Sequence, residues 1–327
     1  MKAAFRAEAV FLAMAMSVVG GQETLGPAPS PPVSSVLADL PLDAQSRSTL
    51  QAAIAKHEYE SAETVLAQAA AQNPKSQPIL LVLANVLFLD GKQLNSALVL
   101  KKAELLGPLD EKDRYLLALA YIAIGRKNLA QAELEKLAQM NPSSAVYPYW
   151  LSRLLYRKTD LQQALLYARQ AVRLDSAFMK GYDQLGLCYA GLNQPDQAIE
   201  AYRTAIRLNR EQSLKWPWPA MNLGTLYLRL ERLDEAEAAL RESLAVEPHF
   251  PVAHLRMGRV LESEGHIDQA IEELKEAARF DPTYPEPHYA LARIYKKRGD
   301  ESSARAELSL FETLRKTDKQ KGITRPD

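Results

Sequence analysis

The residues that could do chemistry in this sequence are few and scattered. Cys188 is the single cysteine, and a catalytic thiolate would need a base and an orienting group that the sequence does not place near it. His57 begins a His-Glu pair without the second histidine of a zinc-protease motif. His249 and His254 have no cluster of Cys, Asp or Glu at ligand spacing. The sequence therefore predicts no catalytic residue, no metal site and no cofactor, with Cys188 buried as a packing residue.

Other signatures of catalysis or nucleic-acid binding are also missing. There is no G-x-S-x-G motif and no glycine loop for phosphate. Lys and Arg number 40, as do Asp and Glu, so the chain has no net charge, whereas a dedicated nucleic-acid binder is usually strongly basic. A composition of 47% hydrophobic and 24% charged residues is that of a folded chain. We therefore expect a folded protein that is not an enzyme and binds no nucleic acid.

A period of 34 residues organises most of the chain. Prolines recur at this spacing or its multiples, with four extra residues between Pro142 and Pro248. The extra residues are Ser213 to Trp216. The prolines that close successive copies are Pro74, Pro108, Pro142, Pro248 and Pro282. Because proline cannot continue a helix interior, each one marks the end of a helical unit.

Three further columns show what each copy contains. One column is small and lies in a second helix: Ala62, Ser96, Ala130, Ala164, Ala198, Ala236, Ala270 and Ala304. The first helix carries an apolar anchor: Leu83, Leu117, Leu151, Leu185, Leu223, Met257 and Leu291. The residue after each anchor is small: Ala84, Ala118, Ser152, Gly186, Gly224, Gly258 and Ala292. Small residues let two helices approach closely, so the columns predict helical hairpins that stack. In the copy from Trp218 to Pro248 we expect Asp234 to cap the second helix.

This pattern resembles the tetratricopeptide repeat family, whose unit is a 34-residue helix–turn–helix. Tyr182-Leu185-Gly186-Tyr189-Ala198-Tyr202 carries the resemblance, as does Leu223-Gly224-Tyr227-Ala236-Leu240-Pro248. The first copy is degenerate, with Thr49 and Leu50 at the Leu-Gly pair. The resemblance implies an all-α fold, a right-handed α-solenoid over residues 43–318. The eight copies are 43–76, 77–110, 111–144, 145–178, 179–212, 217–250, 251–284 and 285–318.

The two ends of the chain differ from the repeats. Residues 1–21 have a basic start and an apolar run from Ala9 to Val19, typical of a secretory signal and too short to span a bilayer. The alternative is an amphipathic leader of a cytoplasmic protein. Residues 22–42 are rich in Pro and Ser and predict an extended linker with no means of packing a core. Residues 319–327 predict a polar, disordered tail. Self-association through the last repeat is a further hypothesis.

The resemblance implies that one face of the first helices lines a concave groove for a partner peptide or helix. Arginine and tyrosine dominate that face, and they favour acidic or C-terminal-carboxylate segments. The alternative is a merely solvated face. The groove prediction comprises Asn85, Tyr115, Tyr149, Arg153, Tyr156, Arg157, Lys180, Trp218, Arg229, Arg259, Tyr289, Arg293 and Lys297. Phe88, Asp183, Met221 and Glu262 share the face. Trp216, the last residue of the insertion, and Trp218, just after it, either fill a gap in the stacking or anchor a ligand.

Three functions are compatible with these features. The first is an exported, non-enzymatic scaffold that binds a protein partner, in assembly of envelope, secretion or pilus machinery. The second is an accessory subunit that presents substrates to a glycosyl- or protein-modifying enzyme encoded elsewhere. The third, an enzyme in its own right, would need titratable side chains that converge in one pocket.

Overall fold

The computed structural model describes residues 37, 40–157 and 159–321, and within them the chain forms sixteen α-helices and no strand. The prediction of an all-α solenoid is confirmed. The chain divides into two compact units, one up to Leu154 and one from Leu155. The predicted signal, residues 1–21, lies outside the described residues, as do residues 22–36, 38 and 39 of the predicted linker.

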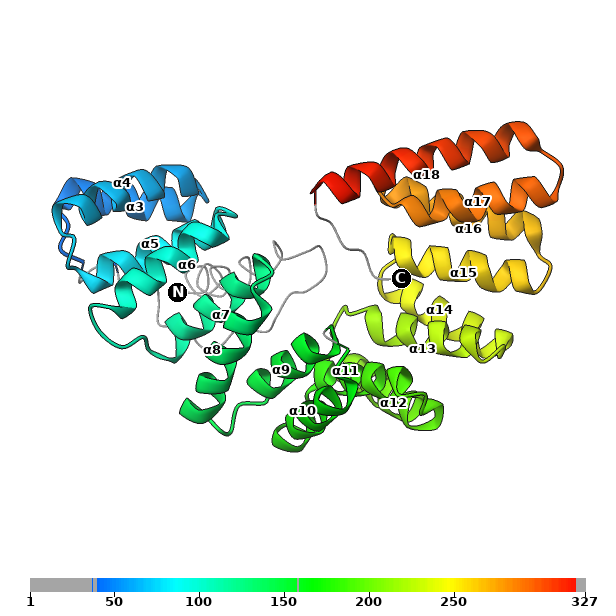
Figure 1. Cartoon of the computed structure of the whole chain (residues 1–327), viewed down its shortest axis with the longest axis horizontal. Helices are drawn as coiled ribbons and strands as arrows, with labels where there is room; N and C mark the ends of the chain where they lie inside the picture. Colours follow the sequence, from blue (N-terminus) through cyan, green and yellow to red (C-terminus); the bar gives the residue numbers. More distant parts are fainter. Residues whose placement is uncertain (1–36, 38–39, 158, 322–327) are drawn as a thin grey trace. The chain divides into compact units, whose positions relative to one another are not determined.

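The first unit is a succession of helical hairpins (Figure 1). The second helix of each hairpin contacts the first helix of the next, α4 with α5 and α6 with α7, and α5 also contacts α7. Its helices are α3 (Ala44–Ala55), α4 (Tyr59–Gln72), α5 (Gln77–Leu89), α6 (Gln93–Glu104), α7 (Glu111–Ala123) and α8 (Lys127–Met140). Helix α9 (Val146–Tyr156) crosses from this unit to the next.

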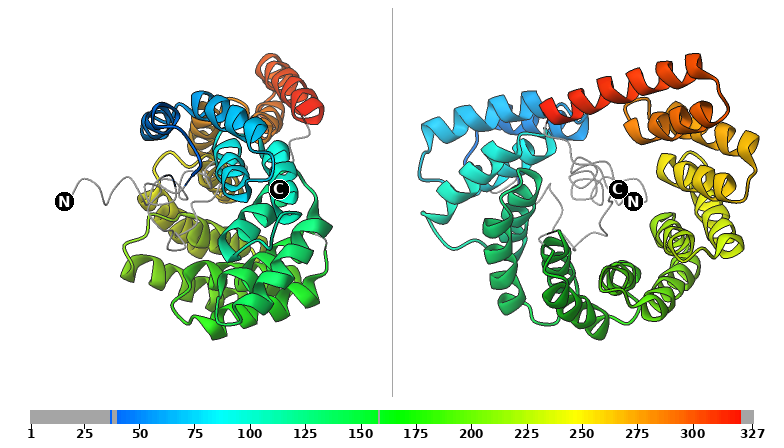
Figure 2. Two further views of the ribbon diagram at one scale, coloured as in Figure 1. Left: turned by 90° about the vertical axis from the view of Figure 1, so that its left-hand side faces the viewer. Right: turned by 45° about the vertical axis from the view of Figure 1, so that its right-hand side comes forward.

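The second unit repeats the arrangement, and Figure 2 shows its hairpins from two further directions. Here the first helices form a continuous row, because α11 contacts α13, α13 contacts α15 and α15 contacts α17. The helices are α10 (Leu161–Leu174), α11 (Met179–Gly191), α12 (Pro195–Glu211), α13 (Trp218–Arg229), α14 (Leu233–Val246), α15 (Pro251–Ser263), α16 (Ile267–Phe280), α17 (Pro285–Lys297) and α18 (Glu301–Lys321).

The small column of the first helices sets how closely the two helices of a hairpin approach. A Cβ added at Gly186 would lie 2.5 Å from the Tyr202 ring, and one at Gly224 would lie 2.7 Å from Leu240 Cγ. These are distances at which carbon atoms overlap. Glycine is therefore required at these copies because the facing residue of the second helix is large and fully buried.

Each hairpin turns through one residue in the left-handed region of backbone conformation. The turn residues recur at the 34-residue period, with the four-residue insertion between Asn193 and Glu231. They are His57, Gly91, Gly125, Thr159, Asn193, Glu231, Gly265 and Gly299. Only glycine adopts this conformation without steric cost, so the four other residue types are held there by the packing of the hairpin.

This turn also corrects the expected cap at Asp234. The N-cap of α14 is Arg232, directly after the turn residue, and Asp234 lies in the first helical turn. Asp160 stands at the repeat position of Arg232, and its side chain accepts a hydrogen bond from the Gln163 amide. A shared register therefore places the cap better than residue type alone.

The four-residue insertion is absorbed mainly by α12. This helix has 17 residues, where α10 and α14 have 14. Trp216 follows the lengthened helix and packs on the cluster of Met179, Ala205 and Leu208. The Asn209 amide donates to the Trp216 carbonyl at 3.0 Å.

Both predicted end segments are corrected where the structure describes them. Leu37 and Leu40 are buried on the first hairpin, and Arg47 donates to the carbonyls of Leu40 and Leu42 at 3.1 Å each. The end of the linker therefore packs, because it covers the apolar side of a hairpin that has no preceding copy. Helix α18 continues to Lys321, three residues into the predicted tail.

Two observations bear on the C-terminal repeat and the membrane. Leu308 and Leu310 of α18 are 41% and 48% exposed, and self-association through this end stays a prediction.

Among the described helices, none combines the length and the apolar character needed to cross a membrane.

Candidate functional site

A hollow of about 540 Å³ lies on the row of first helices in the second unit. Helices α13, α15 and α17, which follow one another in Figure 1, each contribute to it. Four predicted groove residues meet here, and Glu262 lies among them. The lining is Leu228, Arg259, Glu262, Ser263, Tyr289, Ala290, Arg293 and Lys297. We call this lining the hollow.

One carboxylate in the hollow holds two of its three cations. Glu262 of α15 forms ion pairs with Arg293 and Lys297 of α17, the second at 3.1 Å. The Glu262 side chain is 9% exposed, while those of Arg293 and Lys297 are 47% and 67% exposed. The carboxylate therefore lies beneath the two cations and ties consecutive repeats together.

The third cation has no such partner. Within the described part of the chain, the Arg259 guanidinium makes no hydrogen bond or ion pair with another side chain. Arg259 is half-buried. With three cations and one carboxylate in the lining, the hollow carries a formal charge of +2. This arrangement suits an anionic group, and a planar guanidinium suits a carboxylate in particular.

Tyr289 supplies apolar area beside these charges. Its ring is 51% exposed and lies 5.1 Å from the Phe311 ring of α18, between centroids. Leu228, which is half-buried, adds aliphatic surface, whereas Ala290 is buried. The hollow therefore combines one free guanidinium with a partly exposed aromatic wall, a combination that orients a peptide segment.

Two predicted groove residues of the first unit, Tyr115 and Tyr149, belong to a closed aromatic cluster instead. Tyr115, Tyr147, Tyr149 and Trp150 are all buried. The Trp150 indole donates to the Tyr115 hydroxyl at 2.7 Å, and Tyr115 packs edge-on against Tyr147. Arg153 lies over the Trp150 ring, 4.7 Å from its centroid. The expectation that Tyr115 and Tyr149 offer free side chains to a partner is therefore wrong, because helix packing uses them.

Several other predicted residues contact their own unit. Lys180 Nζ lies 4.4 Å from the Trp216 ring centroid, and Trp218 packs edge-on against Phe250 with centroids 4.8 Å apart. Arg229 donates to the Ala190 carbonyl at 3.1 Å. For the two tryptophans these contacts support gap filling over ligand anchoring.

The remaining predictions are dispersed. Asn85 donates to the Leu81 carbonyl at 2.8 Å and Asp183 accepts from Asn222 at 2.9 Å. The side chains of Phe88 and Met221 are buried. Tyr156 packs on the Leu155–Leu185 cluster, and Arg157 is exposed.

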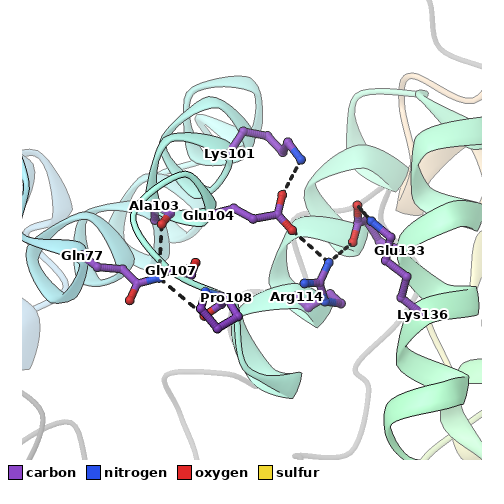
Figure 3. Close-up of polar contacts among 9 residues, drawn as sticks. All are labelled: Gln77, Lys101, Ala103, Glu104, Gly107, Pro108, Arg114, Glu133 and Lys136. Carbon is purple, nitrogen blue, oxygen red and sulfur yellow. Dashed lines mark hydrogen bonds and ion pairs between the residues drawn. The ribbon is translucent and has the colours of Figure 1, made fainter.

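A second charged group, in the first unit, is paired internally (Figure 3). The buried Arg114 donates to Glu104 at 3.1 Å and to Glu133 at 2.5 Å. Lys101 and Lys136 pair with the other oxygens of these two carboxylates. Because each charged side chain has an oppositely charged neighbour, this cluster joins α6, α7 and α8 and presents no unpaired charge to a ligand.

Three residues of the hollow, Leu228, Ser263 and Ala290, are not among the residues predicted from the sequence. Leu228 and Ser263 stand at the twelfth and thirteenth positions of their copies, which belong to the groove face. Their repeat positions alone would have predicted both residues. They were not predicted because charged and aromatic residues were favoured for the groove. Ala290 stands at the sixth position, outside the expected face.

Two histidines hold a carboxylate of the following helix, and Cys188 is buried, as predicted. His254 pairs with Glu273 at 2.6 Å, and His288 pairs with Glu307 at 2.7 Å, one repeat later. In the part of the chain that is described, no group of three or more His, Cys, Asp or Glu residues could hold a metal ion.

Family models match most of the repeat region. Models described as tetratricopeptide repeat match residues 115–177, 179–212 and 220–250, and a model described as TPR repeat matches residues 258–299.

Curated relatives are similar over part of their length. Protein bimA of Emericella nidulans is 32% identical over 89 residues, which are 27% of this chain and 10% of that protein. The BBSome complex member BBS4 of Bos taurus is 27% identical over 169 residues, 51% of this chain and 31% of that protein. The chain thus spans less than a third of the length of either relative.

A solved structure matches more of the chain. A tetratricopeptide repeat protein from Parabacteroides merdae superimposes with a TM-score of 0.62 at 14% identity, covering 82% of this chain and 98% of that one. At this identity the likeness concerns the fold.

Proposed function

Because this chain belongs to the tetratricopeptide repeat family, whose repeats serve as scaffolds for protein–protein interaction, we propose that it binds an acidic segment of a partner protein in the hollow. A carboxylate of that segment pairs with Arg259, and a neighbouring side chain packs on Tyr289. The observation that carries the proposal is the guanidinium of Arg259, a half-buried cation without a partner in the described structure.

The energetics favour a contact of this kind. A hydrogen bond to a charged group contributes about 1.5–3 kcal/mol, and a bidentate guanidinium–carboxylate pair fixes orientation as well. Covering the exposed part of Tyr289 adds apolar burial. These terms together give a modest affinity, as expected of a scaffold that holds several contacts at once.

A displayed library of random dodecapeptides, selected on the full chain, tests the proposal. We expect enriched peptides to contain Asp, Glu or a free C-terminal carboxylate next to an apolar residue. Arg259→Ala should weaken the binding of these peptides at least about tenfold, which corresponds to about 1.4 kcal/mol.

Arg241→Ala is the matched control. Arg241 is an exposed arginine of α14 that pairs with Glu237 and lies outside the hollow. It removes the same charge, so a general electrostatic effect would weaken both variants alike. Enriched peptides without acidic groups, or equal losses in both variants, would refute binding at Arg259.

We also propose that the protein acts outside the cytoplasm, within a larger assembly such as envelope, secretion or pilus machinery. The signal-like residues 1–21 support export, and membership of BBS4 in a complex is an example of a relative that works in an assembly. Cell fractionation and N-terminal sequencing of the mature protein test this. An intact N-terminus in the cytoplasmic fraction would contradict it.

A further inference from the structure

We propose that Glu262 limits the hollow to one ligand carboxylate, so that the partner segment carries a single acidic group beside an aliphatic residue. This inference rests on the proposed function and deepens it. Glu262 pairs with two of the three cations of the hollow, and a ligand meets Arg259, the guanidinium of the hollow for which the described structure gives no side-chain partner.

The burial of Glu262 shows why a ligand does not displace it. The carboxylate is 9% exposed, and its neutralisation comes from Arg293 and Lys297. A ligand that withdrew both cations would leave a nearly buried charge unpaired, and such a group is strongly destabilising. The ligand therefore binds beside this ion-pair group and leaves it intact.

The position of Glu262 also lowers the attraction for a second acid. A run of acidic residues entering the hollow would bring its second carboxylate toward cations that already face a negative charge. Like charges in a partly desolvated site repel one another, so further acids add little. A single carboxylate at Arg259 meets no such competition.

The apolar lining defines the rest of the ligand. Leu228 on α13 is half-buried and offers aliphatic surface beside the helix that carries Arg259, and Ala290 on α17 is small and buried. An aliphatic side chain next to the acidic residue covers this surface. The chemical class is thus a peptide with one carboxylate and an adjacent aliphatic residue, as opposed to a polyacidic tract.

Three fluorescein-labelled peptides with amidated C-termini test the inference on the full chain. All contain one leucine in a Gly-Ser background, followed by one glutamate, three glutamates or one glutamine. By fluorescence anisotropy we expect the one-glutamate and three-glutamate peptides to bind within about threefold of each other. The glutamine peptide should bind at least about tenfold more weakly.

Glu262→Gln releases the two cations and should change this ranking. We expect the three-glutamate peptide to bind this variant at least about tenfold more tightly than it binds the wild type, while the one-glutamate peptide changes by less than about threefold. Circular dichroism establishes that the variant is folded. Arg293→Gln, which leaves Lys297 on Glu262, is a second variant and should leave the one-glutamate peptide within about threefold of wild type.

The outcomes separate this inference from the proposed function. If the three-glutamate peptide binds the wild type about tenfold more tightly than the one-glutamate peptide, the hollow accepts several acids, and the role of Glu262 is wrong while acidic binding stands. An unchanged ranking in folded Glu262→Gln also overturns it. If none of the peptides binds, both proposals fail.

Discussion

Helices α9 and α17 carry the same two residue types at the same two places of the repeat, and the structure uses them differently. Tyr149 and Arg153 stand at the fifth and ninth positions of one copy, as do Tyr289 and Arg293 of another. Tyr149 is 3% exposed and Tyr289 is 51% exposed. Arg153 lies over an indole ring, whereas Arg293 pairs with a carboxylate from the preceding copy.

The neighbours explain the difference. At the sixth position α9 has Trp150, which reaches the Tyr115 hydroxyl on α7, and α17 has Ala290. At the twelfth position of the preceding copy the first unit has Ile122, and the second has Glu262. A large ring therefore closes the face in one unit, and its absence leaves the hollow in the other.

This comparison shows that a groove position is defined by two copies together. Trp150 of α9 contacts Tyr115 of the preceding copy, and Arg293 of α17 pairs with Glu262 of the preceding copy, so the exposure of Tyr149 and Tyr289 depends on both copies. In repeat proteins each unit contacts its nearest neighbours, so function depends on such pairs. The predictions below test this dependence.

The largest expected effect comes from emptying the closed face. Trp150→Ala removes a buried ring and its hydrogen bond to Tyr115, and should destabilise the first unit by about 3–5 kcal/mol. Tyr289→Ala should cost about 1 kcal/mol or less, because half of that ring is already in water. Urea unfolding followed by far-ultraviolet circular dichroism measures both. Equal losses would show that the two faces do not differ.

Filling the hollow is the converse test. Ala290→Trp places on α17 the residue that α9 has at the sixth position, and should abolish acidic peptide binding. Because Ala290 is buried, the larger ring should also lower stability by about 1–3 kcal/mol. Anisotropy and urea unfolding measure the two effects. Unaltered peptide affinity in a folded variant would place binding elsewhere.

The sequence predicts the fold well because the same pattern of residues recurs in each copy. Any one anchor such as Leu223 or small residue such as Gly224 is weak evidence, but the 34-residue register makes them agree. The turns follow the same register, because Gly125 and Glu231 share a left-handed conformation that residue type alone would not suggest for a glutamate.

The site is less predictable, because exposure depends on residues one copy away. Arg259 and Arg293 are equivalent in register, and only the structure shows that Glu262 holds one of them. Tyr115 has the residue type of a groove residue and is buried by aromatic neighbours. The packing of Leu37 could not be predicted either, because this short apolar segment lies outside the repeats and has no equivalent position in another copy.

The two regions should respond to different ranges of pH. Burial, together with the nearby Asp110 charge, raises the pKa of Asp113 on α7 from 3.8 to about 6. The folded state then holds its proton more tightly than the unfolded state, so the first unit loses stability as pH rises from about 4 to about 6. Asp113→Asn should be more stable than wild type at neutral pH, and this difference should vanish near pH 4.

His254 on α15 makes the stability of the second unit depend on pH in a different range. Burial alone would lower its pKa, but hydrogen bonds to Glu273 and the Pro248 carbonyl raise the pKa above the ordinary 6.5. Both ring nitrogens face an acceptor, at 2.6 and 2.9 Å, so both bonds form only in the charged ring. This stabilisation is complete below about pH 6.5 and is lost as pH rises through the folded-state pKa.

Thermal melts of wild type, Asp113→Asn and His254→Gln across pH measure both effects. Asp113→Asn should remove the loss of stability between about pH 4 and about pH 6, and His254→Gln should remove the loss of stability above about pH 6.5. A His254→Gln protein that keeps the full loss of stability above about pH 6.5 would show that another group causes it.

The smallest expected effect concerns the turns that join the two helices of a hairpin in each unit. Gly125 joins α7 to α8, and Glu231 joins α13 to α14, both with positive φ. Glu231→Gly removes the strain of a side chain in this conformation, at the cost of more freedom in the unfolded chain, and should stabilise by about 0.5–1 kcal/mol. Gly125→Glu should destabilise by about 1 kcal/mol for the opposite reason. Urea midpoints measure the two changes, and peptide affinity should stay the same in both, because neither turn lines the hollow. If Glu231→Gly altered the affinity, the α13–α14 turn would have to control the position of Leu228, and the hollow would depend on whole hairpins as well as on its lining residues.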